Sequence, residues 1–249
     1  MPRHALLRAT LMCLAWFPGA LNAVPALSLA TLYDYLEPHR SSAVKRVENL
    51  GEHTAFVKVE LAEITFDSAG RAVETLLPGD GLQRALLVTP AQFIVPAKGV
   101  RNVRLIFRGQ RAAERYFRVR FVPVVPQAGD GFAQQSEEVA AYKAALDAGV
   151  RVLKALGGVL VVRPADTRYA TEVSANAAGW VLRNQGNATV LMDNLRQCQP
   201  EGEACELGRK VHVRPGQHER LPPPARGKQY RFDLIEGTQV KAMQYPDVD

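Results

Sequence analysis

Hydrophobic and polar residues alternate with a period of two along most of this chain. The pattern is clearest in two neighbouring segments, 103–108 and 117–122, whose apolar positions are Val103, Leu105, Phe107, Phe117, Val119 and Phe121. Alternation of this kind predicts strands with one buried face. The polar link between the two segments predicts that they pair as antiparallel neighbours. Arginine fills many of the outward positions, which raises the question of binding, although a solvated sheet face explains it equally well.

Further apolar runs are separated by turn signals rich in glycine, proline, asparagine and aspartate. They predict strands near residues 56–66, 86–95, 159–162, 180–183, 190–195, 211–213 and 230–234. The turn Asn184–Asn187 predicts a hairpin between the runs on either side of it. Short strands spaced in this way are typical of antiparallel sandwiches, and there are too many for one sandwich. We therefore predict an all-β chain of two domains with a break near Arg163.

One long connection departs from this pattern. Residues 127–149 begin with a glycine- and glutamine-rich stretch, and Glu138–Leu146 is rich in helix formers. A long connection of ambiguous propensity next to a strand is a place where function is expected. The alternative is a surface helix that covers a sheet edge.

The first residues have the features of a secretory signal peptide. Two arginines precede an apolar run over 9–17, and a Pro18-Gly19 break and small residues follow. We predict cleavage after Ala23, or after Ala26, and export of a chain with no membrane-spanning segment, because the run is too short to cross a bilayer. The predicted organisation is a signal peptide at 1–23, an N-terminal domain at 24–163 and a C-terminal domain at 164–249.

Composition and charge exclude some functional classes. The chain has 249 residues, 47% hydrophobic, and a formal net charge of +6. Removal of residues 1–23 takes away two arginines and no acid, which leaves +4. This excess is interspersed with acidic residues rather than clustered, so nucleic acid is not an expected partner.

Two cysteines remain after export, Cys198 and Cys205. They flank a Pro-Glu-Gly turn, which suits a disulfide that closes a short loop in an oxidising compartment. Such a bridge contributes on the order of 2–3 kcal/mol by loop entropy. A zinc site would need two more ligands within reach, so we expect no metal and no cofactor.

No catalytic constellation is evident in the sequence. Four histidines remain after export and are scattered among turns: His39, His53, His212 and His218. The sequence has no G-x-S-x-G motif. A surface metal site at His212 and His218 is one alternative, but a polar hairpin is the expected setting for both. The chain is therefore not expected to be an enzyme.

Four segments, in this order, resemble the periplasmic chaperones of chaperone–usher pili, in particular the alternate branch that serves coli-surface-antigen-type fimbriae. They are LLVTPAQFIVPAKGVRNVRLIF, ERYFRVRFVPV, VLVVRPAD and NQGNATVLMDNLRQC followed by a second cysteine. The resemblance implies two immunoglobulin-like sandwiches in a boomerang and no catalysis. It also implies a periplasmic protein that binds pilus subunits lacking a strand and delivers them to an outer-membrane usher.

The resemblance implies a donor strand at the end of the N-terminal domain, within Gly149–Val162. We group Val150 and Val152 on one face of that strand and Leu153, with Leu156, on the other, and only one of these sets can enter a subunit groove. We favour Val150 and Val152; their alternative role is in the chaperone's own core.

The family's cleft anchors a subunit carboxylate with an arginine on the first strand and a lysine on the last. This chain departs from the pattern, because Leu27–Tyr35 has no basic residue and Val159 stands at the lysine position. Arg46, Arg151 and Lys154 are the candidates in compensation, and each has an ordinary surface charge as its alternative role.

The family's interdomain ionic network implies three further residues, Glu114, Arg163 and Glu236, the last preferred over Asp233. Their alternative is a set of unrelated surface charges.

Two other functional classes are considered. A pilin or adhesin would also be exported and disulfide-bonded, but it would carry a donor extension directly after its signal. A secreted hydrolase would need the catalytic groups that are missing above. Whether the free chaperone self-associates is left open.

Overall fold

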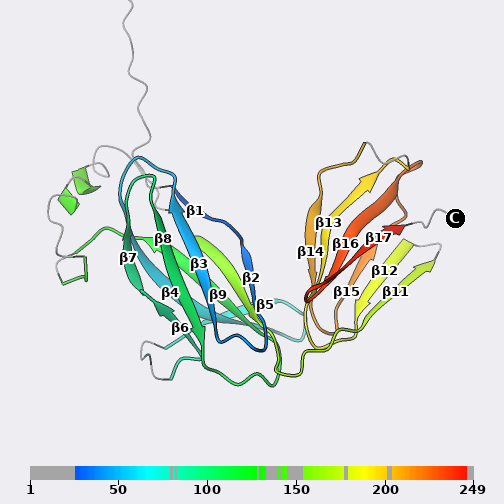
Figure 1. Ribbon diagram of the computed structural model, residues 1–249, viewed down its shortest axis with the longest axis horizontal. Helices are drawn as coiled ribbons and strands as arrows, with labels where there is room; N and C mark the ends of the chain where they lie inside the picture. Colours follow the sequence, from blue (N-terminus) through cyan, green and yellow to red (C-terminus); the bar gives the residue numbers. More distant parts are fainter. Residues whose placement is uncertain are drawn as a thin grey trace, which may run out of the picture.

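The chain forms two β-sandwiches joined at one end (Figure 1). The computed structural model describes residues 26–78, 81, 83–127, 129–132, 139–140, 142–144, 154–176, 179–200 and 204–245. The last strand of the first sandwich ends at Val162, and the first strand of the second begins at Thr171. The predicted signal peptide lies outside the described residues.

The N-terminal sandwich packs a four-stranded sheet against a six-stranded one. The first, sheet A, has the order β1 (Leu27–Leu29), β3 (Ser42–Asn49), β8 (Val100–Phe107) and β6 (Leu86–Thr89). The second, sheet B, has the order β2 (Tyr33–Leu36), β10 (Leu156–Val162), β9 (Arg115–Pro123), β4 (Ala55–Phe66) and β5 (Ala72–Leu76), and β7 (Gln92–Val95) also pairs with β4.

The alternating apolar residues of both sheets fill the core between them. They include Val47, Val103, Leu105, Phe107, Phe117, Val119, Phe121, Leu160 and Val162, all nearly inaccessible to solvent. Burial of one such side chain contributes roughly 1.5–3 kcal/mol, so this face fixes the fold. The prediction of an all-β chain with these buried faces is confirmed.

The prediction that the segments 103–108 and 117–122 pair with each other is wrong. β8 pairs with β3 and β6, whereas β9 pairs with β4 and β10. The polar link between β8 and β9 therefore crosses from one sheet to the other. Two strands with one apolar face each bury those faces fully when they stack across the core of a sandwich.

The predicted first strand, Leu27–Tyr35, is divided between the two sheets. β1 is antiparallel to β3 in sheet A, whereas β2 runs parallel to β10 in sheet B. Residues 30–32 form the crossing between them.

The C-terminal sandwich has the same architecture. Sheet C has the order β11 (Thr171–Asn176), β12 (Gly179–Asn184) and β15 (His218–Leu221). Sheet D has the order β14 (Arg209–Val213), β13 (Val190–Cys198), β16 (Gln229–Glu236) and β17 (Gln239–Tyr245). Trp180, Leu182, Met192 and Phe232 are among the buried residues between them. The predicted hairpin at Asn184–Asn187 is wrong, because β12 and β13 stack in different sheets rather than pair.

The long connection after β9 carries helical residues at 139–140 and 142–144. Its Phe132 and Tyr142 rings pack on Phe56 at the start of β4, with ring centroids 5.5 and 5.3 Å away. The described part of this connection therefore covers one end of sheet B. Within the part of the chain that the structure describes, no helix is long and apolar enough to cross a membrane.

Candidate functional site

The junction of the two domains is organised around Arg163, which directly follows β10. Its side chain is only 3% exposed. Nη1 donates to the Thr189 carbonyl at 3.0 Å, and the guanidinium lies over the rings of Tyr35 and Tyr169, 4.7 and 5.3 Å from their centroids. A planar cation suits this position, because it stacks on aromatic faces while it donates in its own plane. Residues of both sandwiches thus hold one side chain.

Glu114 supplies the buried carboxylate of this junction. Its Oε2 lies 3.4 Å from Arg163 Nη1, and its two oxygens accept from the Thr189 backbone N–H at 3.0 and 2.9 Å. The Tyr116 hydroxyl donates to the same carboxylate at 2.5 Å. Burial, and then the Glu114 charge, hold the pKa of Tyr116 above its usual range. The carboxylate therefore joins the two domains by hydrogen bonds as well as by charge.

The third residue of the implied network is placed differently. Glu236 accepts from Thr171 Oγ1 at 2.6 Å. The second carboxylate beside Arg163 is that of Glu37, 3.2 Å from Nε. Parallel pairing of Leu36 with Val162 sets Glu37 next to Arg163. This neighbourhood depends on a strand pairing that the sequence does not specify.

An aromatic contact forms a second link between the domains. The Tyr33 ring stacks on His212 of β14 with centroids 3.8 Å apart, and the Tyr35 hydroxyl lies 2.6 Å from His212 Nδ1. The sequence led us to expect His212 on a polar hairpin. The structure instead places it on β14 against Tyr33 and Tyr35 of the other domain. Burial, and then the nearby Lys210 charge, lower its pKa to about 4, while Asp193 opposes the shift. The Tyr35 hydroxyl and His212 Nδ1 share a hydrogen bond: the neutral ring accepts from the hydroxyl in the tautomer protonated at Nε2 and donates to it in the tautomer protonated at Nδ1.

We expect this contact to make the folded protein less stable in mild acid. The unfolded chain takes up a proton on His212 near its ordinary pKa of 6.5, whereas the folded chain does so only near 4. Stability is therefore lost as the pH falls from 6.5 to 4, by about 1–2 kcal/mol once solvent screening is allowed for. The difference between the thermal midpoints at pH 7 and pH 4.5 should be smaller in His212→Phe than in wild type. His218→Phe, on an exposed histidine, should keep the wild-type pH dependence; equal pH dependence in all three proteins would contradict the prediction.

A cavity of about 230 Å³ lies between the domains beside this contact. Its walls are mostly apolar and include Tyr33, Ile64, Phe66, Tyr116, Val159 and Val161. Two guanidinium groups, those of Arg118 and Arg214, also border it. The Arg214 guanidinium lies 3.3 Å from the centroid of Phe66, and Arg118 Nε donates to Glu74 at 2.9 Å. The sequence showed the arginines of β9 as outward-facing but gave no sign that they border a cleft.

β10 has one partly unpaired edge. All seven of its residues pair with β9, but β2 pairs only with Val159–Val162. Within the described residues, Leu156–Gly158 have no strand on the β2 side, and we call this segment the open edge. Unpaired backbone N–H and C=O groups at such an edge are a template for another strand.

Most residues of the implied donor strand fall outside this description. Val150, Val152 and Leu153 lie outside the described residues, as does Arg151. Leu156 is half-buried at the start of β10, opposite Phe121.

The remaining anchor candidates lie at different places. Lys154 is exposed just before β10. Arg46 lies on the outer face of sheet A, 55% exposed, and pairs with Glu48 at 2.6 Å. The structure therefore does not bring Arg46 to the open edge.

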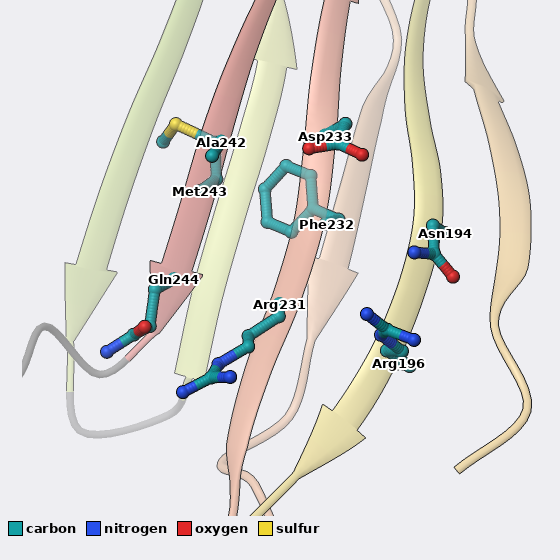
Figure 2. A pocket seen from close by; sticks show the side chains of 8 residues that line it. All are labelled: Asn194, Arg196, Arg231, Phe232, Asp233, Ala242, Met243 and Gln244. Carbon is teal, nitrogen blue, oxygen red and sulfur yellow. The ribbon is translucent and has the colours of Figure 1, made fainter. Parts of the chain in front are cut away.

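A larger hollow of about 520 Å³ lies on the C-terminal domain (Figure 2). All its lining residues come from β13, β16 and β17, among them Arg196, Arg231, Asp233 and Gln244. Both signs of charge are present, so it does not select a charged ligand by sign. It plays no part in the contacts that join the domains.

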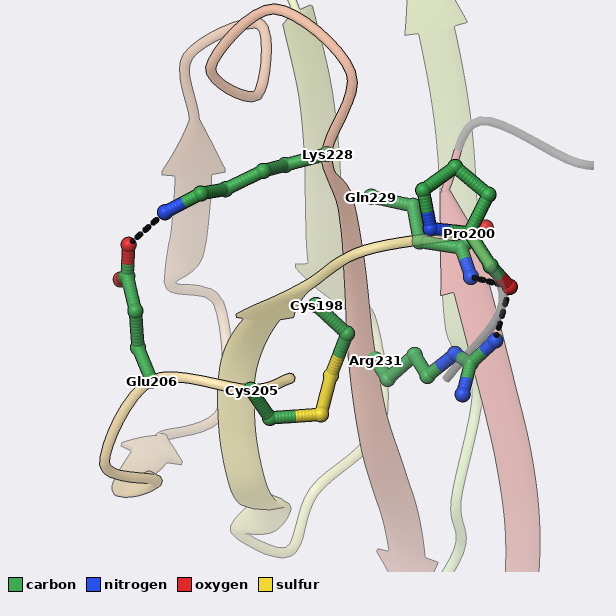
Figure 3. The surroundings of a disulfide bond; sticks show 7 residues. All are labelled: Cys198, Pro200, Cys205, Glu206, Lys228, Gln229 and Arg231. Atoms are coloured by element: carbon green, nitrogen blue, oxygen red, sulfur yellow. Dashed lines mark hydrogen bonds and ion pairs between the residues drawn. A yellow bond between two sulfur atoms is a disulfide. The ribbon is translucent and has the colours of Figure 1, made fainter. Parts of the chain in front are cut away.

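The disulfide closes the end of β13 (Figure 3). Cys198 and Cys205 are bridged with an S–S length of 2.08 Å, as predicted. Lys228 pairs with Glu206 at 2.6 Å, and Arg231 Nη2 donates to the Pro200 carbonyl at 3.0 Å. These contacts fix the loop to β16, so its role is structural.

Taken together, the geometry describes two immunoglobulin-like sandwiches held in a boomerang by a buried ionic junction, with a partly open strand edge on the first. The same fold occurs in the Class 5 fimbriae chaperone CfaA, with a TM-score of 0.54 and 16% identity over 90% of this chain and all of that one. It also occurs in a structure of the Salmonella enterica SafA pilin in complex with the SafB chaperone, with a TM-score of 0.50, 13% identity, and 89% and 96% coverage.

In sequence, the chain is similar to the Escherichia coli O157:H7 protein named "Probable fimbrial chaperone EcpB". The two are 22% identical over 223 residues, 89% of each chain. No protein-family model matches the chain. The resemblance to the periplasmic chaperones of chaperone–usher pili, predicted from the four segments, is confirmed by these relatives.

Proposed function

We propose that this protein is a periplasmic chaperone that binds pilus subunits by strand addition and passes them to an outer-membrane usher. The observation that carries the proposal is the open edge of β10, on a scaffold whose fold matches fimbrial chaperones over nearly the whole chain. The similarity to proteins named as fimbrial chaperones supports the same role. These relatives are not enzymes, and a non-catalytic role agrees with them.

Strand addition supplies what an incomplete subunit lacks. A pilin without its last strand exposes an apolar groove and unpaired strand edges, which promote aggregation. Backbone hydrogen bonds from the segment that leads into the open edge would satisfy those edges, and alternate apolar side chains would fill the groove. Val150 and Val152 remain our proposed donors, with Leu153 on the other face. Strict alternation puts Leu156 in the phase of the two valines rather than with Leu153.

The subunit carboxylate needs a cationic anchor near the end of the added strand. The position of the family's lysine corresponds here to Val159, which pairs with Tyr33, and the first strand Leu27–Tyr35 has no basic residue. Lys154, exposed just before the open edge, is our preferred anchor among the described candidates, with Arg151 next to the proposed donors as the second. Arg46 is less favoured, because it lies in the other sheet and is already paired with Glu48.

The alternative of a pilin or adhesin subunit is not favoured. The matches to fimbrial chaperones cover both sandwiches rather than one. A secreted hydrolase has no support from the relatives.

The test is co-expression of the chain with candidate pilins that lack a complete sandwich, followed by purification through a tag on the chaperone. We expect a stable one-to-one complex from the periplasm, together with loss of pilin by aggregation and proteolysis when the chaperone is absent. A pilin whose last residues are deleted serves as the control and should not be retained. Recovery of folded pilin at equal yield with and without the chaperone would refute the proposal.

A further inference from the structure

Lys45 is a buried charge that strand addition does not directly use. It lies on β3 in the core-facing phase, and its side chain is only 4% exposed. A buried ammonium is costly unless every donor has a partner. Its Nζ donates to the Thr31 carbonyl, to Thr31 Oγ1 at 3.0 Å and to Asp34 Oδ2 at 2.6 Å. An ammonium has three donors, so these contacts use all of them and leave none for a ligand.

The partners of Lys45 lie where the first strand changes sheets. Thr31 is in the middle of the crossing between β1 and β2, and Asp34 is the second residue of β2. Thr31 Oγ1 also donates to Asp34 Oδ1 at 2.9 Å, which closes a ring of contacts around the crossing. Lys45 therefore fastens the crossing to β3 beneath it.

The same crossing ends the pairing of β2 with β10. Val159 is opposite Tyr33, and the Val159 N–H donates to the Leu32 carbonyl at 2.7 Å. Continuation of this register would set Gly157 opposite Thr31 and would direct the Gly157 N–H to the carbonyl of residue 30. The chain instead turns away at Thr31, whose carbonyl is bound by Lys45.

A glycine allows the crossing to lie this close to β10. A Cβ on Gly158 would be 3.3 Å from the Leu32 carbonyl oxygen and 3.7 Å from both Cε and Nζ of Lys45. The Leu32 carbonyl and the end of the Lys45 side chain therefore lie close to Gly158, the last residue of the open edge.

We infer that Lys45 is a positioning residue that keeps the open edge of β10 unpaired. By holding Thr31 toward sheet A, it stops the protein's own first strand from extending along Leu156–Gly158. Without this contact, that strand would cover the edge and compete with an incoming subunit. The benefit to subunit capture rests on the proposed function, but the effect on the edge does not.

The test is backbone amide exchange in the free protein, followed by NMR at Gly157. In Lys45→Met the Gly157 amide should exchange about tenfold more slowly than in wild type, because a new ladder hydrogen bond protects it. Lys45→Arg should restore fast exchange at least in part, because a guanidinium can donate to the same oxygens. Lys241→Met, the same substitution on the exposed β17, should leave Gly157 unchanged. Unchanged exchange at Gly157 in folded Lys45→Met would overturn the inference.

Two milder variants keep the test decisive if Lys45→Met does not fold. Thr31→Val removes the hydroxyl but not the carbonyl, and Asp34→Asn removes the charge partner; both should slow Gly157 exchange in the same direction, and no slowing in either would overturn the inference. Subunit capture is then measured separately. Slower exchange with undiminished capture would sustain the role of Lys45 and refute the open edge as the binding edge.

Discussion

Replacement of Arg163 with methionine is expected to loosen the junction between the two domains and to lower stability. The change removes a guanidinium whose side chain is only 3% exposed and leaves the Glu114 carboxylate, 2% exposed, without its cation. Loss of one partner from a buried pair costs about 3–5 kcal/mol. For a chain of this size that corresponds to a fall in thermal midpoint of roughly 6–20 °C. Calorimetry measures the midpoint, and small-angle X-ray scattering reports whether the interdomain angle broadens.

A nearby arginine provides the matched control. Arg168→Met removes a side chain that is 77% exposed and lies 3.9 Å from Asp166, so its midpoint should stay near that of wild type. The double variant Arg163→Met, Glu114→Gln should recover part of the loss, because no unpaired charge is then buried and the two sites are coupled. A single variant with unchanged midpoint and unchanged scattering would show that the junction does not set the angle.

The strands were predictable from the sequence because apolar and polar residues alternate along a sandwich strand whatever its neighbours are. Val103, Leu105 and Phe107 alternate whichever strand lies beside them, so the pattern identifies a buried face but not a neighbour. That is why the predicted pairing of β8 with β9 is wrong although both strands are correctly placed. The same reasoning explains the wrong hairpin at Asn184–Asn187, where the chain also crosses between sheets.

The functional residues were harder to predict because they depend on contacts between distant segments. Tyr33 and His212 meet across 179 positions of sequence, and nothing local marks either as an interdomain contact. Glu37 joins Arg163 through a parallel pairing that only the fold defines. Lys45 is the exception, because it takes the core-facing phase between Ala43 and Val47. A lysine in the phase of buried residues is a signal that the pattern contained.

The junction and the open edge together explain how one short strand can serve two purposes. The C-terminal half of β10 is paired on both sides and ends in the Arg163 junction, so it is firmly held. Of the strands that the structure describes, β9 alone pairs with its first residues, Leu156–Gly158. A subunit strand added there would meet a rigid end at Tyr33, which would limit how far it could slide. Register in strand addition is set by such fixed ends together with the side chains that fill the groove.

Replacement of both Val150 and Val152 with glutamate is expected to abolish retention of the pilin while the chaperone stays folded. Each buried valine contributes roughly 1.5–3 kcal/mol of apolar transfer, and a buried unpaired carboxylate costs several kcal/mol more. The loss of the two valines alone corresponds to a fall in affinity of at least about a hundredfold. Co-purification of the pilin measures retention, and circular dichroism confirms the fold.

Two further variants make this result specific to one face of the donor segment. Val44→Glu introduces the same change at a valine of sheet A that is 56% exposed, and it should leave pilin recovery at the wild-type level. Leu153 lies on the opposite face by strand alternation. Leu153→Glu should therefore lower the chaperone's thermal midpoint, while the folded variant should still recover pilin. Undiminished recovery with the double glutamate variant would refute the donor assignment. Loss of capture with Leu153→Glu alone, in a folded protein of wild-type midpoint, would move the donor face to the leucine side, because a groove that receives one face of a strand excludes the other.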